Sequence, residues 1–262
     1  MPKDQTILFH STIFGPIHSR RLGTSLGINL SPADGKVCSF DCLYCEAGFN
    51  AQGPGKAGLP TRAATAMQLR AKLEQMKADG QTLDVITFSG NGEPTLNPEF
   101  PEILQDTLRL RDEFFPNAKV SVLCNSTRLD NPAVVEALKM ADNNILKLDS
   151  AVEKTMRLID RPTQKSFTVA KLLPELQAIG DKCIIQTMML RGEYEGHKVD
   201  NTTEEEINAL EDAYRLIRPR QIMLYSIDRS TPAEHLQKVP TDELRAIGQR
   251  IEQNTGIPVQ VN

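Results

Sequence analysis

The chain has 262 residues, of which 40% are hydrophobic and 24% are charged, and its net charge is −4. This composition is ordinary for a globular protein, and no apolar run approaches the ~20 residues that a membrane helix needs. The acidic balance disfavours strong nonspecific binding to nucleic acid, and the absence of Trp leaves little surface for stacking bases. Residues 1–5 do not resemble a signal peptide, so we expect a cytoplasmic protein with no membrane partner.

Apolar segments of strand length alternate with segments of helical period along the chain. Such alternation predicts parallel strands joined by right-handed helical crossovers, with helices outside a curved, open sheet. We therefore expect an α/β fold in a single domain over residues 1–262, divided into an N-terminal extension (1–24), a barrel core (25–230) and a C-terminal helix and tail (231–262). The predicted strands cover residues 25–30, 84–88, 119–124, 144–149, 182–189 and 220–226.

Several helix starts are marked by capping residues. Thr203, with Glu206 three residues later, predicts a helix that begins with a capping box. Asn97 and Asn131 each precede a proline, which predicts an N-cap followed by proline at the first helical position. The Gly- and Ala-rich residues 47–64 are expected to form a loop.

Three cysteines, Cys38, Cys42 and Cys45, lie in one short run. Their spacing places three sulfurs on a single loop, as in proteins that bind iron–sulfur clusters. Four thiolates would saturate a four-iron cluster, whereas three leave one iron open to a substrate or cofactor. Zinc and disulfides are the alternatives. Structural zinc usually takes two pairs of ligands, and no second pair follows here; the odd total of five cysteines disfavours disulfides.

This Cys-x3-Cys-x2-Cys run, with Tyr44 before its last cysteine, resembles the signature of the radical S-adenosylmethionine (radical SAM) superfamily. The resemblance implies the radical SAM core fold, a partial (β/α)6 barrel, with a [4Fe–4S] cluster on the three cysteines and S-adenosylmethionine (SAM) as a second cofactor. In that superfamily the reduced cluster cleaves SAM to a 5′-deoxyadenosyl radical, which abstracts hydrogen from a substrate. The resemblance also implies that Tyr44 contacts the adenine.

A second motif, at residues 89–94, follows an apolar strand and is similar to the superfamily's Gly-Gly-Glu-Pro segment, which holds the methionyl amino group. Asn91 stands where the first of the paired glycines would be, and Asn tolerates unusual dihedral angles. Glu93 could accept a hydrogen bond from the methionyl amine or could brace the turn by accepting backbone N–H groups. Residues 15–23 are similar to the branch that includes wyosine-type tRNA-modifying enzymes. The expected cofactor-binding residues of the motif are Gly90, Asn91, Gly92, Glu93 and Pro94.

Ligands of parallel α/β folds bind at the carboxyl ends of the strands, where this chain has further polar residues. Lys147 and Asp149 alternate with leucines and should point into the barrel. Burying both charges is costly unless they pair or touch a ligand. Either Asp149 or Ser150 contacts the cofactor and Lys147 faces substrate or a carboxylate, or the two charges form a structural pair. The other cofactor candidates at this end are Asn125, Gln186 and Met188.

The remaining candidates have both a functional and a structural interpretation. Cys124, at the ligand end of its strand, is a candidate hydrogen donor or a small buried hydrophobe, and Cys183 is expected to pack in the core. Residues 191–200 form either a lid over the site or a solvated loop. A basic cluster upstream of the cysteines is either an anion site or a solvated patch. Its residues are His18, Arg20 and Arg21.

The sequence thus predicts an enzyme that generates a 5′-deoxyadenosyl radical and acts on an RNA base, a peptide or a small molecule. The chain shows no second redox centre, so we expect a flavodoxin or ferredoxin to supply the electron. The alternative class is a non-catalytic iron–sulfur binding or electron-transfer protein.

Overall fold

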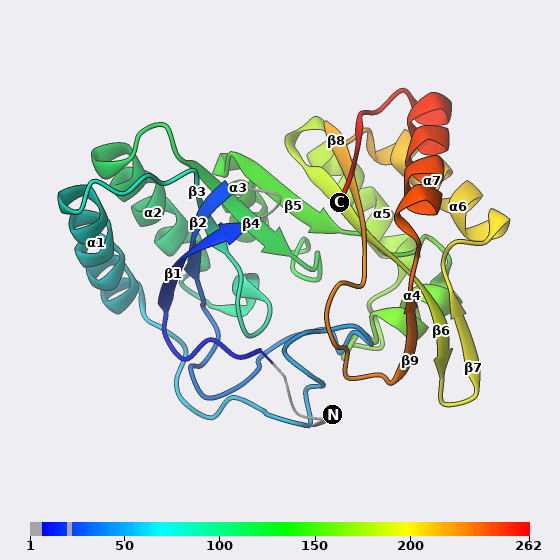
Figure 1. Cartoon of the computed structure of the whole chain (residues 1–262), viewed down its shortest axis with the longest axis horizontal. Helices are drawn as coiled ribbons and strands as arrows, with labels where there is room; N and C mark the ends of the chain where they lie inside the picture. The colour runs from blue at the N-terminus through cyan, green and yellow to red at the C-terminus, as the bar shows by residue number, and fades with distance from the viewer. Residues whose placement is uncertain (1–6, 20–22) are drawn as a thin grey trace.

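The structure is a computed structural model, which describes residues 7–19 and 23–262. The strands are β1 (Ile13–Ser19), β2 (Gly23–Ile28), β3 (Val85–Phe88), β4 (Lys119–Cys124), β5 (Asn143–Lys147), β6 (Ile184–Tyr194), β7 (His197–Asp200), β8 (Gln221–Ser226), β9 (His235–Lys238) and β10 (Val259–Val261). In the described residues they form one sheet in the order β1-β2-β3-β4-β5-β6-β8-β10, with β7 and β9 also paired to β6. β1 and β10 lie at opposite edges, so the sheet is open (Figure 1).

The central strands of the sheet are parallel. From β2 to β8 each neighbouring pair in the order runs in the same direction, and β10 continues this pattern beyond β8. Each of the six predicted segments overlaps one of the strands β2, β3, β4, β5, β6 and β8. The structure therefore confirms the predicted α/β fold with parallel strands in a partial (β/α)6 barrel.

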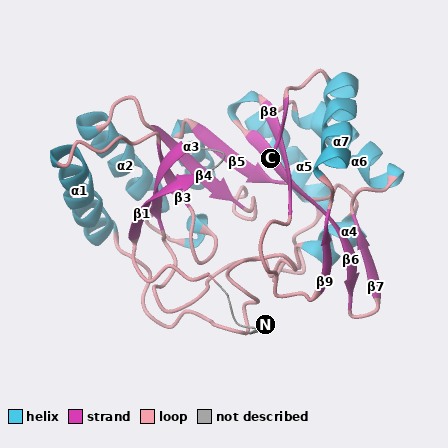
Figure 2. Cartoon of the chain, viewed as in Figure 1, coloured by secondary structure: helices cyan, strands magenta, loops and turns pink. Residues whose placement is uncertain are grey.

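Helices cover the outside of this curved sheet. They are α1 (Arg62–Ala78), α2 (Phe100–Phe114), α3 (Pro132–Met140), α4 (Glu153–Ile159), α5 (Val169–Ile179), α6 (Glu204–Ile217) and α7 (Thr241–Thr255), with short 3-10 helices η1 (Pro94–Leu96) and η2 (Gly180–Lys182). In Figure 1, α1 and α2 flank one side of the sheet and α5, α6 and α7 the other. The long loop between β2 and α1 runs below both sides, as the loop colouring of Figure 2 makes clear.

The two faces of the sheet differ in what they bury. Apolar strand residues such as Leu26, Phe88 and Leu146 belong to the large core that also contains the helices' inward side chains. A separate, small apolar cluster of Ile145, Ile184 and Met223 lies apart from that core. Because side chains alternate along a strand, Lys147 projects from the same face of β5 as Ile145, which is the inner face.

Two predicted helix caps are present at the expected positions. The Thr203 hydroxyl accepts the Glu206 backbone N–H at 3.3 Å, and the Asn131 side chain accepts the Ala133 N–H at 3.0 Å. Each bond satisfies a backbone donor that the first helical turn leaves without a partner. The capping box at Thr203 is only half formed, because the Glu206 carboxylate accepts a hydrogen bond from Ser150 instead.

Two other predicted boundaries are wrong. Asn97 does not cap a helix, since its Oδ1 accepts the Glu99 backbone N–H at 2.9 Å and closes a turn, and α2 begins only at Phe100. The predicted loop over residues 47–64 ends early, because Thr61 caps α1 and Arg62 is already helical. In both cases local side-chain bonds to the backbone decided the boundary.

The edges of the sheet also depart from expectation. Residues 13–19, predicted to lie in an extension beside the sheet, form β1 and pair antiparallel with β2. The C-terminal tail adds β10 to the opposite edge. The polar residues 191–200 are not a loop, because β6 continues to Tyr194 and pairs antiparallel with β7. Glu195 and Gly196 both have positive φ, the geometry of a tight hairpin turn.

Two further expectations concern the surface and the N-terminal region. Of the expected basic cluster, Arg20 and Arg21 lie outside the described residues. Across the described part of the chain, no helix has both the length and the apolar character that crossing a bilayer requires.

Candidate functional site

Cys38, Cys42 and Cys45 line one cavity of about 230 Å³ at the carboxyl end of the parallel strands. All three are free thiols, and Cys42 is buried while the other two are partly exposed. The rest of the wall is formed by residues at the end of β4, by those that follow β3 and β4, by Lys147 at the end of β5 and by Gln186 near the start of β6. The cavity therefore lies where ligands bind in parallel α/β folds.

Backbone hydrogen bonds hold the cysteine loop against both sides of the sheet. On one side Val37 accepts the Glu93 N–H at 3.1 Å. On the other, the Leu43 N–H donates to the Ile159 carbonyl at the end of α4, at 2.9 Å. Within the loop, the Cys45 N–H donates to the Cys42 carbonyl at 3.2 Å and closes a turn. The positions of the sulfurs are thus fixed by contacts from distant parts of the chain.

The glycines at 90 and 92 are required by close backbone contacts. A Cβ on Gly92 would lie 1.9 Å from the Val37 carbonyl oxygen, so no larger residue fits beside the cysteine loop. Gly90 has φ +153, and a Cβ there would lie 2.4 Å from Asn29 Oδ1. The backbone of this segment thus lies so close to Asn29 and Val37 that only glycine fits at these two positions.

Asn91 differs from these glycines because the structure uses its side chain. Its amide nitrogen donates to the carbonyls of Phe9 (2.8 Å) and Pro32 (3.0 Å), and its Oδ1 accepts the Phe9 N–H at 2.7 Å. Asn91 is fully buried, and its φ is not positive. An unusual dihedral angle is therefore not the reason for Asn at this position; it fastens residues near the N-terminus to the motif.

Glu93 lies buried at the cavity wall and ties two segments together. Its Oε1 accepts hydrogen bonds from the Thr95 N–H (3.0 Å) and hydroxyl (2.6 Å), and its Oε2 accepts the Asn125 N–H at 2.6 Å. Burial raises the pKa of Glu93, although these bonds oppose the shift. The Asn125 side chain in turn lies 3.6 Å from the Cys38 sulfur. Glu93 thus braces the turn while it lines the cavity.

Tyr44, Lys147 and Asp149 form a buried polar triad beside the cysteines. The Lys147 ammonium donates to the Tyr44 oxygen at 2.5 Å and lies 3.3 Å from Asp149 Oδ2. The Tyr44 hydroxyl donates to the Asp149 carboxylate, whose other oxygen accepts the Met188 N–H at 2.9 Å. Burial opposes the charge of Lys147, but Asp149 and the other acidic groups around it together outweigh burial and hold the pKa of Lys147 well above its ordinary value. The predicted inward pair is therefore present as an ion pair.

The chemistry of the three thiols fits an iron–sulfur cluster. Burial raises the pKa of Cys38 to about 11 and that of Cys42 well above its usual value, so as free thiols they stay protonated. Cluster iron binds thiolate and would take the place of these protons. Among the described residues, no group of three or more His, Cys, Asp or Glu side chains is placed so that it could hold a single metal ion.

A family model described as the radical SAM superfamily matches residues 34–202, about two thirds of the chain. The matched segment contains the three cavity cysteines and the glycines at 90 and 92. The chain belongs to the radical SAM superfamily.

Curated relatives of this radical SAM chain come from several bacteria. It is 31% identical to UPF0026 protein slr1464 of Synechocystis sp., covering 85% of this chain and 77% of that protein. It is 28% identical to a UPF0026 protein of Helicobacter pylori, over 88% of this chain and 71% of that one. A Brachyspira hyodysenteriae protein named GTPase Obg is 27% identical over 99% of this chain, which spans only 36% of that protein.

Several solved structures have a similar fold. A radical SAM methyltransferase from Sphaerobacter thermophilus has a TM-score of 0.65 at 14% identity, over 91% of this chain and 65% of that one. SuiB of Streptococcus suis bound to S-adenosylmethionine has a TM-score of 0.61 at 15% identity, over 90% of this chain and 50% of that one. TYW1 with a lysine-pyruvate adduct has a TM-score of 0.56 at 13% identity, over 90% of this chain and 76% of that one. At these identities the similarity shows the fold.

In this radical SAM fold the predicted site residues separate into two groups. The expected cofactor residues that line the cavity are Tyr44, Gly90, Gly92, Glu93, Asn125 and Gln186, and both Lys147 and Cys124 line it as well. Five others lie outside the lining: Asn91, Pro94, Asp149, Ser150 and Met188. Ser150 points away, since its hydroxyl donates to Glu206 at 2.6 Å, and Asp149 lies behind Tyr44 and Lys147. The roles of these residues toward a cofactor stay predictions.

The two remaining cysteines lie in different surroundings. The Cys124 sulfur accepts the Ser126 N–H at 3.3 Å inside the site, and burial raises its pKa well above the usual value. Cys183 is fully buried in the main apolar core, so it packs as the sequence predicted.

Sequence reasoning missed two charged residues at the site. Lys36 lines the cavity two positions before the first cysteine, where nothing in the sequence distinguishes it from a surface lysine. Asp160, at the end of α4, lies 3.8 Å from the Cys42 sulfur. Burial and the neighbouring Asp149 raise the pKa of Asp160 well above its ordinary value. Only the packing of α4 against the cysteine loop brings Asp160 there.

Proposed function

We propose that this chain is a radical SAM enzyme that cleaves SAM to a 5′-deoxyadenosyl radical and uses it to abstract hydrogen from a substrate. One observation carries the proposal: the three cysteines and the glycines at 90 and 92 line the same cavity. Three thiol ligands would leave one iron of a [4Fe–4S] cluster open to a further ligand, and the glycines of the second motif lie at the same cavity.

The residues of the chain would divide the work of binding and orientation. Cys38, Cys42 and Cys45 would hold the cluster, which when bound supplies one electron for cleavage of the SAM sulfonium. Gly90 and Gly92 line the cavity and would place their backbone beside the amino-acid end of SAM, and Asn125 offers an amide at the wall. Apolar side chains in the lining limit the access of water to a reactive radical.

The substrate and the electron donor are parts of the same proposal. An RNA base, a peptide and a small molecule remain the candidate substrates; among proteins of similar fold, one SuiB structure contains a precursor peptide. We propose a flavodoxin or ferredoxin as the donor, because the described chain contains no second cluster of thiols. A modified-nucleoside profile that is unchanged in a deletion strain would eliminate the RNA base.

The decisive experiment is anaerobic reconstitution with iron and sulfide, followed by incubation with dithionite and SAM. The wild-type protein should form 5′-deoxyadenosine, detected by mass spectrometry. Cys45→Ala should reduce its formation to background, because a ligand of the cluster is lost. Cys183→Ala is the matched control and should retain the activity, since Cys183 is buried in the core away from the cavity.

Three other results would contradict the proposal. A loaded cluster that releases no 5′-deoxyadenosine would indicate a non-catalytic iron–sulfur protein. Zinc in place of iron in protein purified without oxygen would indicate a structural metal site. Equal loss of activity in the Cys45 and Cys183 variants would show that the cavity cysteines are not specifically required for the reaction.

A further inference from the structure

Lys36 is a buried cation at the cysteine cavity. Its side chain is only 1% exposed, and its Nζ donates to the Gly48 carbonyl at 2.7 Å, on the part of the loop that follows Cys45. Removing an ammonium group from water costs several kcal/mol unless nearby negative charge compensates. The position of Lys36 therefore requires a compensating charge close to its Nζ.

The carboxylate nearest to Lys36 compensates it poorly. Asp41 Oδ1 lies 3.9 Å from the Lys36 Nζ, at the limit of an ion pair, and the same oxygen accepts the Asn50 N–H at 2.6 Å. The other oxygen of Asp41 lies 3.5 Å from Arg161. Asp41 thus divides its charge between two cations. Most of the compensation for Lys36 would come from the cysteine sulfurs once they bind iron as thiolates, since Lys36 lines the same cavity.

We propose that Lys36 is a positioning residue that raises the reduction potential of the cluster held by the three cysteines. The inference rests on the cluster assignment made under the proposed function. Reduction adds one negative charge to the cluster. A fixed positive charge at the cavity wall stabilises the reduced form more than the oxidised form, and the low dielectric of a buried site strengthens this effect. Asp41, being negative, should act in the opposite direction.

This role has a consequence for electron supply. A higher potential makes the cluster easier to reduce by a weak protein donor, so Lys36 would set which donors can drive SAM cleavage. The hydrogen bond to Gly48 keeps the cation in place, because it ties Nζ to the loop that carries the sulfurs. The positive charge is thus a fixed part of the site and does not depend on ions from the solvent.

The test compares midpoint potentials by redox titration monitored with electron paramagnetic resonance, on full-length reconstituted protein without SAM. For Lys36→Met we expect a shift to more negative potential. At a fixed solution potential, the ratio of reduced to oxidised cluster should fall by roughly tenfold, which corresponds to about 59 mV for a one-electron couple. Asp41→Asn should shift the potential in the positive direction. Lys56→Met, which removes the same charge from an exposed position of the same loop, should leave it unchanged.

The outcomes distinguish this inference from the proposed function. Wild-type protein that takes up no cluster would overturn both. A loaded Lys36→Met protein with the wild-type potential would overturn the inference alone. If Lys36→Met takes up no iron, Asp41→Asn decides: a positive shift supports electrostatic tuning, and an unchanged potential refutes it. An equal shift in Lys56→Met would show a general effect of net charge and would also refute it.

Discussion

Gly92 lets the two sequence motifs of the site lie in close contact, because it has no side chain. The residue before Cys38 and the glycine segment run so close together that Val37 O would lie 1.9 Å from a Cβ at position 92. The backbone N–H of Glu93 donates to the same carbonyl. One residue therefore sets the distance between the cysteines and the segment expected to bind the amino-acid end of SAM.

Gly92→Ala is expected to push these segments apart. Overpacking of this kind costs about 1–3 kcal/mol, and the cost should appear in the free energy of unfolding measured with denaturant. The iron and sulfide contents after reconstitution should fall below those of wild type, because the sulfurs no longer hold their positions. Gly53→Ala is the control, since no atom lies within 4 Å of its added Cβ. Full cluster loading in Gly92→Ala would disprove the coupling.

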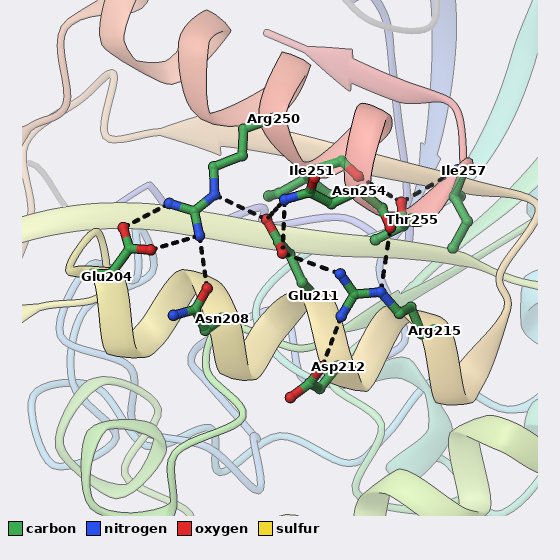
Figure 3. A network of polar contacts seen from close by, with 10 residues as sticks. All are labelled: Glu204, Asn208, Glu211, Asp212, Arg215, Arg250, Ile251, Asn254, Thr255 and Ile257. Atoms are coloured by element: carbon green, nitrogen blue, oxygen red, sulfur yellow. Dashed lines mark hydrogen bonds and ion pairs between the residues drawn. The ribbon is translucent and has the colours of Figure 1, made fainter.

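Helices α6 and α7 are joined by a buried carboxylate, shown in Figure 3. Glu211 on α6 accepts hydrogen bonds from Arg250 Nε at 3.0 Å and from the Asn254 amide at 3.0 Å, both on α7. Arg250 also reaches Glu204 at the start of α6. Since α7 leads directly into β10, this network positions the last strand of the sheet.

Glu211→Gln removes the charge from the centre of this network with little change of shape. We expect a loss of about 1–2 kcal/mol in the free energy of unfolding, because the charge-assisted hydrogen bonds weaken while the partly exposed arginines regain water. The matched control is Asp212→Asn, one residue further, whose side chain is 79% exposed. It should change stability by less than about 0.5 kcal/mol. Equal effects of the two variants would mean that burial of Glu211 does not matter.

At the scale of the whole molecule, the cysteine loop connects the two sides of the open sheet. Val37 bonds to the segment after β3, while Leu43 donates to Ile159 and accepts the Ala233 N–H at 3.2 Å, on the opposite side. In Figure 1 this loop passes below both groups of helices. A group that rigidifies the loop would therefore stabilise contacts on both sides.

Removal of the cluster with a chelator should loosen both contacts at once. We expect faster hydrogen exchange of the Glu93 and Leu43 amides and a lower Tm than in the loaded protein, because ligand binding to the native state stabilises it. The amide of Arg218, which donates to Tyr214 at the end of α6, serves as the internal control and should not change. If hydrogen exchange became faster at only one of these two amides, or at neither, the cysteine loop would not connect the two sides of the sheet.

Local patterns in the sequence were sufficient for much of the fold. Alternation of strand and helical periods predicted the six central strands, and the caps at Asn131 and Thr203 marked two helix starts. The edges were missed, because β1 contains Gly15 and Pro16, which are rare in strands, and β10 has only three residues. The cap predicted at Asn97 was wrong for a related reason: an Asn-Pro pair fits a turn as well as a helix start.

The sequence by itself determined the parallel α/β class and the motif of three cysteines, since periodicity and spacing are properties of neighbouring residues. Only the tertiary structure decided what surrounds those cysteines. It directed Ser150 toward Glu206, placed Lys36 in the cavity wall, and brought Asp160 to Cys42. Asp160 and Cys42 are separated by more than a hundred residues, and contacts of this range arise from packing, which no local pattern encodes.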